Sequence, residues 1–184
     1  MNRSYVLSKS LKGAEIRHIR DSLGMSRQEF AAFANCSGRT LERWEREDAE
    51  VTGPIVSLLE ILTRDNQLPK RLELPEMESR LRLIYKKGFC VCTVIDVNET
   101  AREVQIRNYV RDPMLTAFGV NTEPTYEEYE AFLESRCFPR TRDKMKLELR
   151  KLGIPFYDPL LIIEKTEGRM AEDDFRIEIV RRKG

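Results

Sequence analysis

The stretch LGMSRQEFAAFANCSGRTLERWE, residues 23–45, contains two short helical patterns with a turn between them. Ser26 stands before the first pattern and Glu29 follows three residues later, which is the spacing of a capping box. Ser37 stands before the second pattern, whose apolar side chains recur one turn apart. Asn35 lies between the two, and asparagine tolerates a positive φ better than any residue except glycine. The stretch therefore predicts two helices joined by a tight turn at Asn35.

Helical spacing continues on both sides of this stretch. LKGAEIRHIRDSLG, residues 11–24, has apolar side chains at helical spacing and ends at Gly24. TGPIVSLLEILTR, residues 52–64, has Thr52 as a candidate cap and Pro54 in its first turn. Together with the opening stretch, these patterns predict an all-helical region over residues 11–63.

The hydrophobic period changes after residue 77. The segment 64–77 carries two prolines and no clear period, which predicts a linker. Three strand-like runs follow, and they predict an antiparallel meander: LRLIY, FCVCTVIDV and REVQIRNYV. Cys90 and Cys92 alternate with apolar residues in the second run, so both are expected to be buried thiols.

Helical patterns return after the meander, followed by one more strand. Thr125 is expected to cap YEEYEAFLESR, Gly153 to close TRDKMKLELRKLG, and Asp158 to open DPLLIIEKTEG. DFRIEIV alternates again and predicts a last strand. The expected fold class is α+β, with an all-α N-terminal domain over residues 1–63 and a small α+β domain with an antiparallel sheet over residues 78–184.

The N-terminal region resembles the lambda-repressor/Cro family of helix-turn-helix domains. Ala31 stands where that family places a small residue between its second and third helices, and Leu41 stands at an apolar core position. The run Arg43-Trp44-Glu45 looks like the end of a recognition helix. Two positions depart from the pattern: Asn35 replaces the usual turn glycine, and Arg27 stands where the family often has glutamine.

The resemblance implies that the second helix of the pair enters the DNA major groove. Gly38, Arg39 and Arg43 would then face base edges, and arginine reads guanine through its O6 and N7 atoms. The full set of implied DNA-contacting residues is Arg27, Gln28, Ser37, Gly38, Arg39, Thr40 and Arg43. The alternative is a helical domain kept for protein contacts, because four acidic residues surround the arginines and weaken the positive field: Glu42, Glu45, Glu47 and Asp48.

The segment RCFPRTRDKMKLELRK, residues 136–151, is the most basic part of the chain. Its cationic residues are Arg136, Arg140, Arg142, Lys144, Lys146, Arg150 and Lys151. One interpretation is a contact with nucleic acid or with a ribonucleoprotein. The other is a solvated helix face, since Met145, Leu149 and Leu152 form an ordinary buried stripe.

Composition excludes several classes of function. The formal net charge is +1, so any nucleic-acid binding must depend on a local basic face. Four cysteines lack C-x-x-C spacing and His18 is the only histidine, so we expect no metal site. No catalytic pairing or phosphate loop is apparent, so we expect no enzyme activity and no cofactor. No apolar run approaches the ~20 residues that span a membrane, and a cytoplasmic location is expected.

The chain as a whole resembles the helix-turn-helix-bearing anti-CRISPR proteins, in its plan and in the tail FYDPLLIIEKTEGRMAEDDFRIEI. This resemblance implies an inhibitor that binds a type II CRISPR effector–guide RNA complex and blocks DNA cleavage. Its helix-turn-helix domain would bind double-stranded DNA, and it would either repress its own promoter or assist the inhibition. The alternative is a transcriptional repressor or the antitoxin of a toxin–antitoxin pair. A homodimer is expected in either case, because one small domain reads few base pairs.

Overall fold

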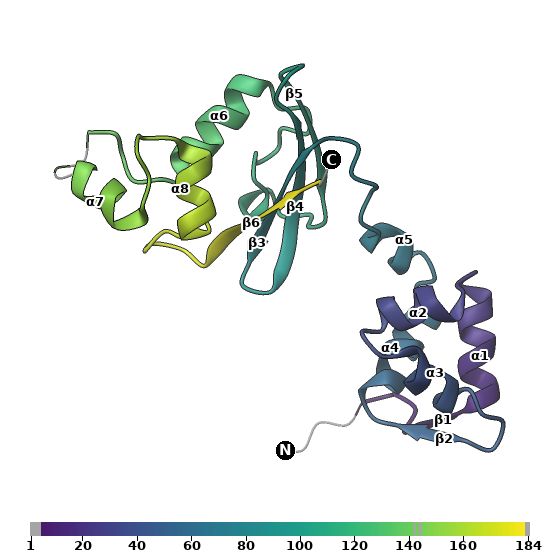
Figure 1. Cartoon of the computed structure of the whole chain (residues 1–184). Coiled ribbons are helices and arrows are strands. Elements are labelled where there is room, and N and C mark those ends of the chain that lie inside the picture. The colour runs from purple at the N-terminus through teal and green to yellow at the C-terminus, as the bar shows by residue number, and fades with distance from the viewer. Residues whose placement is uncertain (1–4, 142, 144, 183–184) are drawn as a thin grey trace. The chain divides into compact units, whose positions relative to one another are not determined.

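A computed structural model describes residues 5–141, 143 and 145–182. The chain divides into two compact units, Met1–Leu74 and Pro75–Gly184 (Figure 1). The described residues form eight α-helices and two antiparallel sheets, which confirms the α+β class. Within these residues, no helix combines the length and the apolar character that a membrane crossing requires.

The first unit packs five helices around one core. Its elements are β1 (Ser10–Lys12), α1 (Gly13–Ser22), α2 (Arg27–Phe33), α3 (Gly38–Trp44), β2 (Glu50–Thr52), α4 (Pro54–Arg64) and α5 (Leu68–Leu72). The core side chains Ile16, Phe30, Leu41 and Leu59 are completely buried. Because they come from four different helices, their burial fixes how α1 to α4 pack. The short α5 lies within the segment 64–77 that was expected to be a linker.

Two short strands replace part of the expected all-helical region. β1 and β2 pair antiparallel, with Leu11 opposite Val51. Thr52 therefore belongs to a strand and does not cap α4; Gly53 occupies that position with a φ of 95°. A second glycine permits the close approach of the backbone after α3 to the start of α1, because a Cβ at Gly13 would lie 1.8 Å from the Arg46 carbonyl oxygen.

The turn between α2 and α3 has the geometry that the sequence predicts. Ser26 and Glu29 form a reciprocal capping box at the start of α2. Asn35 has a φ of 50°, which confirms the expected positive value. The Asn35 N–H donates to the Ala32 carbonyl at 3.2 Å and the Cys36 N–H to the Ala31 carbonyl at 2.9 Å. These two bonds are those of a Schellman motif, which ends α2 and turns the chain toward α3.

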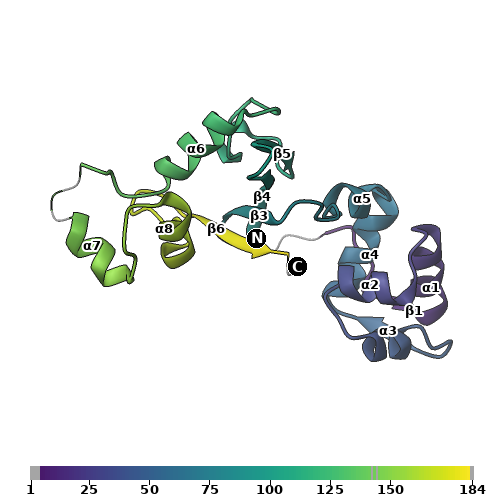
Figure 2. The same cartoon turned by 45° about the horizontal axis from the view of Figure 1, so that its top comes forward.

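The second unit is a four-stranded antiparallel sheet with helices on one face. Its strands are β3 (Leu81–Lys87), β4 (Cys90–Asn98), β5 (Glu103–Asn108) and β6 (Phe175–Arg181), in the order β5-β4-β3-β6. The meander and the last strand are therefore confirmed. The helices are a 3₁₀ turn η1 (Pro113–Leu115) and α6 (Tyr126–Ser135), α7 (Met145–Leu152) and α8 (Pro159–Thr166). Figure 2 shows α6 beside β5 and α8 beside β6.

The caps of the second unit follow the sequence signals. Thr125 and Glu128 form a capping box on α6, and the Asp158 carboxylate accepts from the Leu161 N–H at the start of α8. Gly153 has a φ of 70° after α7. The thiols are only partly as expected: Cys92 is buried, but Cys90 is exposed because it begins β4 beside the hairpin turn.

The helices cover one sheet face, and the core lies between them. Leu83 of β3 and Ile95 of β4 are opposite each other and completely buried against Ile162 and Ile163 of α8. On the other face, Arg82 pairs with Asp96 through two 2.7 Å hydrogen bonds. The same guanidinium donates to the carbonyl oxygens of Pro75 and Glu76, so it holds the first residues of this unit against the sheet.

Candidate nucleic-acid interface

The residues implied to contact DNA lie on α2 and α3, apart from Ser37, which is the N-cap residue immediately before α3. Arg27, Gln28, Ser37, Gly38, Arg39 and Arg43 are exposed, and Thr40 is half-buried. Helices α2 and α3 pack together through the buried side chains of Phe30, Ala31 and Leu41. The buried and the exposed residues of α3 thus lie on different sides of this helix, and the polar side chains are accessible.

The start of α3 is held by local hydrogen bonds. The Ser37 hydroxyl accepts from the Thr40 N–H at 3.1 Å, so Ser37 is the N-cap that the sequence predicts. The two hydroxyl groups also lie 2.8 Å apart, within hydrogen-bond distance. These contacts engage both hydroxyl groups within the chain, at the first turn of α3.

Arg39 and Arg43 are the two exposed cations of α3. They are four residues apart and therefore share a face of the helix. Within the described part of the chain, neither side chain has an ion-pair partner. Both guanidiniums can therefore donate bidentate hydrogen bonds to an external acceptor without breaking an internal contact.

Glu45 does not weaken the field of these arginines in the way that the sequence suggested. Only 1% of its side chain is exposed. Arg20 Nε donates to Oε1 at 2.6 Å and Arg27 Nε donates to Oε2 at 2.7 Å. Burial alone would raise the pKa of the Glu45 carboxyl, but the hydrogen bonds from the two arginines together hold it below the ordinary value. Its charge is therefore compensated inside the unit.

The structure adds Arg20 to the residues that shape this site. Arg20 is buried on α1, where Nη1 also donates to the Met25 carbonyl at 2.9 Å. The sequence did carry a signal, because Arg20 is four residues after Ile16 and so lies on the apolar face of its helix. An arginine at such a position needs a buried partner, and Glu45 supplies it.

The basic segment 136–151 is not a continuous cationic surface. Arg136 was expected on that surface, and this prediction is wrong, because it is buried with 7% exposure. Its guanidinium donates to both carboxylate oxygens of Asp173 and to the carbonyl oxygens of Gly168 and Phe175. These bonds replace the water that a buried charge loses, so Arg136 ties α6 to the start of β6.

The other cations of this segment are of three kinds: those with an ion-pair partner, those without one, and those outside the described residues. Arg140 is exposed but pairs with Glu134 at 2.7 Å, and its guanidinium lies over the Tyr157 ring. Lys151 pairs with Glu148 at 3.0 Å. Lys146 and Arg150 are exposed on α7 and have no ion pair among the described residues. Arg142 and Lys144 lie outside the described residues.

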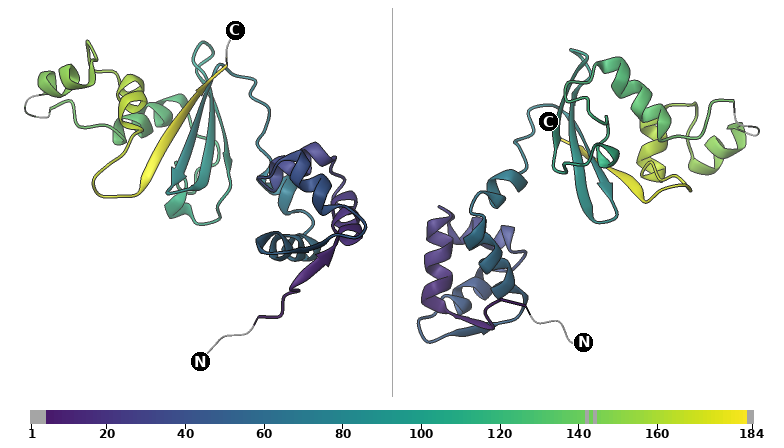
Figure 3. Two further views of the ribbon diagram at one scale, coloured as in Figure 1. Left: turned by 60° about the horizontal axis from the view of Figure 1, so that its bottom comes forward. Right: turned by 180° about the vertical axis from the view of Figure 1, so that it is seen from behind.

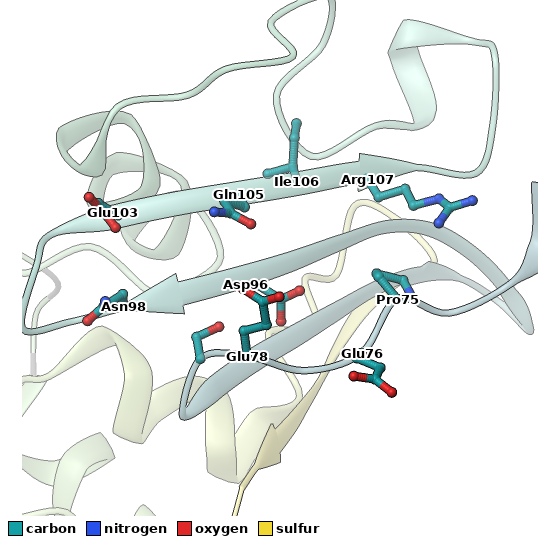
Figure 4. A pocket seen from close by; sticks show the side chains of 10 residues that line it. Pro75, Glu76, Glu78, Asp96, Asn98, Glu103, Gln105, Ile106 and Arg107 are labelled. Atoms are coloured by element: carbon teal, nitrogen blue, oxygen red, sulfur yellow. The ribbon is translucent and has the colours of Figure 1, made fainter.

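The uncovered sheet face carries an acidic groove of about 600 Å³. Figure 4 shows the segment that follows Pro75 on one side and β4 and β5 on the other, with Arg107 and Glu103 toward opposite ends. Its carboxylates belong to Glu76, Glu78, Asp96 and Glu103. Asp96 is already paired with Arg82, and the remaining negative charges oppose the approach of a polyanion. The charge of this groove therefore does not favour nucleic-acid binding.

The described residues contain no group of three or more histidine, cysteine or acidic side chains placed to hold a metal ion. His18 is exposed on α1. The chain matches no protein-family model and no curated protein sequence. The features of the described residues that bear on function are the geometry of α2 and α3 and the exposed charges.

Proposed function

We propose that the first unit is a helix-turn-helix domain of the lambda-repressor/Cro class and that the protein is a sequence-specific DNA-binding regulator. The observation that carries this proposal is the pair Arg39 and Arg43, which are exposed on one face of α3 and lack internal ion-pair partners. The Schellman turn at Asn35 supports it, because this turn leads from α2 directly into α3.

In this proposal α3 lies in the major groove and its arginines donate to guanine O6 and N7. Gln28 and Thr40 are placed beside the phosphate backbone, where contacts fix the register of the protein and carry no sequence information. Arg27 adds a phosphate contact through the guanidinium nitrogens that Glu45 does not use. Two copies of the chain would read two half-sites and so double the contact area.

The test is selection of binding sites from a random pool of duplex DNA, followed by affinity measurements on the selected site. Arg39→Ala and Arg43→Ala should each weaken binding to that site by about 1–3 kcal/mol and relax the base preference at one position. Arg111→Ala is the matched control, because Arg111 is an exposed arginine of the other unit. Selection of no sequence, or full affinity in the double Arg39/Arg43 variant, would exclude this function.

A second candidate function is inhibition of a type II CRISPR effector–guide RNA complex. The exposed Lys146 and Arg150 of α7 favour it, because DNA binding through α3 does not require these two cations. A guide-loaded effector presents phosphate-rich RNA, and charge contacts speed association at low salt.

A guided DNA cleavage assay tests this candidate. The wild-type chain should slow cleavage, and the double variant Lys146→Glu/Arg150→Glu should restore it, while Arg111→Glu should inhibit like the wild type. If the wild-type chain leaves cleavage unchanged, the regulator proposal stands alone.

A further inference from the structure

The last strand of the second unit leaves one edge of the sheet unpaired. β6 pairs with β3 on one side and has no neighbouring strand on the other side among the described residues. It is seven residues long, and in Figure 3 it runs along the outer side of the sheet. A long edge strand presents unpaired N–H and C=O groups, which are a template for pairing with another strand.

The ladder determines which backbone groups point outward. Arg182 N–H donates to the Arg80 carbonyl, so the even-numbered residues of β6 direct their N–H and C=O groups toward β3. The odd-numbered residues therefore face the free edge. Ile177 N–H is already taken there by the Glu167 carbonyl at 2.7 Å. The N–H groups of Ile179 and Arg181 have no partner in the described part of the chain.

A groove of about 610 Å³ lies at this edge. Its lining includes Ile163 and Glu164 of α8 together with Glu178 and Ile179 of β6. Glu178 and Ile179 point to opposite faces of the sheet, because successive side chains of a strand alternate. A hollow that both of them line must follow the edge itself, which is the place that an added strand would occupy.

We propose that β6 pairs with β6 of a second copy of this chain, antiparallel across a two-fold axis at Val180. This register places Ile179 of one copy opposite Arg181 of the other, so the free N–H and C=O groups of both residues are used. It also places Glu178 opposite Arg182 in both directions, at positions without backbone bonds, where opposing side chains lie closest.

Charge selects this register over the neighbouring register centred on Ile179. If the two-fold axis lay at Ile179 instead, Ile179 would stand opposite Ile179 of the other copy. Arg176 would then stand opposite Arg182 in both directions, so two pairs of like charges would meet. That shift would also require the N–H of Ile177, which Glu167 already holds. Of these two registers, only the one centred on Val180 uses free backbone groups alone and joins opposite charges.

The experiment is a charge exchange in the whole chain, followed by sedimentation velocity over a range of concentrations. Glu178→Arg brings arginine against Arg182, and Arg182→Glu brings glutamate against Glu178, so each variant alone should raise the dimer dissociation constant about tenfold or more. An equimolar mixture of the two variants restores both opposite-charge pairs and should form the dimer again.

Two controls separate this interface from local effects. Glu178 also pairs within the chain with Lys86, so Lys86→Gln removes that pair and should leave the dimer intact. Thermal unfolding of each variant shows that the fold is kept, and the mixture would not recover a dimer from unfolded chains. A monomeric wild type at about 50 µM, dimeric single variants, or a mixture that stays monomeric would each overturn the proposal. None of these results bears on DNA contact by Arg39 and Arg43.

Discussion

Arg20 Nε donates to Glu45 Oε1 over 2.6 Å, and the exposed fractions of the two side chains are 10% and 1%. Arg20 belongs to α1 and Glu45 is the C-cap residue of α3, so this contact joins the first helix to the end of the candidate recognition helix. Arg27 of α2 donates to the second carboxylate oxygen. One carboxylate therefore fixes three helices relative to one another.

Replacing Glu45 should destabilise the first unit strongly. Glu45→Ala leaves the buried Arg20 guanidinium without its main partner, so we expect the free energy of unfolding of this unit to fall by about 3 kcal/mol. Glu45→Gln keeps an acceptor and should cost less. Urea denaturation followed by Trp44 fluorescence measures both. A loss in Glu45→Ala no greater than that of an exposed glutamate such as Glu42→Ala would contradict the structural role of this pair.

The same carboxylate makes the stability of the first unit depend on pH. The pKa of Glu45 is lowered in the folded state, so the unfolded chain binds its proton more readily than the folded chain does. The stabilising contribution is complete above the ordinary glutamate pKa of about 4.3 and is lost as pH falls through the folded value. Denaturation at several pH values between about 3 and 7 should show this loss in the wild type and a weaker one in Glu45→Gln.

Arg136 and Asp173 should form an equivalent structural pair in the second unit. The Arg136 guanidinium, through its hydrogen bonds, holds the pKa of the Asp173 carboxyl below its ordinary value. Asp173→Ala leaves a buried charge with carbonyl partners only and should lower the free energy of unfolding by about 2 kcal/mol. The neighbouring Asp174→Ala is the matched control, because Asp174 is exposed. Equal losses in the two variants would mean that the pair does not hold α6 to β6.

The sequence predicted elements with local signals and missed those that depend on distant partners. Capping boxes span four residues, so Ser26 with Glu29 and Thr125 with Glu128 could be identified without a structure. β1 and β2 have three residues each and pair across about 40 positions, so no period reveals them.

Burial of charge was missed for the same reason. Arg136 is part of a visibly basic segment, but its partner Asp173 is 37 positions away. Arg39 and Arg43 could be assigned to one face of their helix from the sequence, because they are four residues apart. The pairing of Glu45 with two arginines required the packing of three helices, which spacing within one helix does not determine.

The turn at Asn35 gives a test of backbone preference. At a φ of 50°, a side chain with a Cβ is strained by ~1–2 kcal/mol, glycine is not, and asparagine is partly relieved by local hydrogen bonding. Asn35→Gly should therefore keep or raise the free energy of unfolding, whereas Asn35→Ala should lower it by about 1 kcal/mol. Chemical denaturation of the three proteins gives the order, and an alanine variant as stable as the glycine variant would show that the turn does not need a positive φ.

Arg27 should contribute to DNA affinity without contributing to sequence preference. Its side chain is 55% exposed, and Glu45 uses only its Nε, so the terminal nitrogens can reach a phosphate. Each phosphate contact adds about 0.9 to the slope of log K against log salt concentration. Arg27→Gln should flatten this slope by about that amount and weaken the selected and unrelated duplexes equally, whereas Arg39→Ala should mainly weaken the selected one. Arg27→Gln also loses the ion pair with Glu45, which could lower stability. Its thermal unfolding is therefore compared with that of Gln28→Ala, a variant that keeps this ion pair. An unchanged slope in a fully folded Arg27→Gln variant would remove Arg27 from the interface and confine its role to the compensation of Glu45.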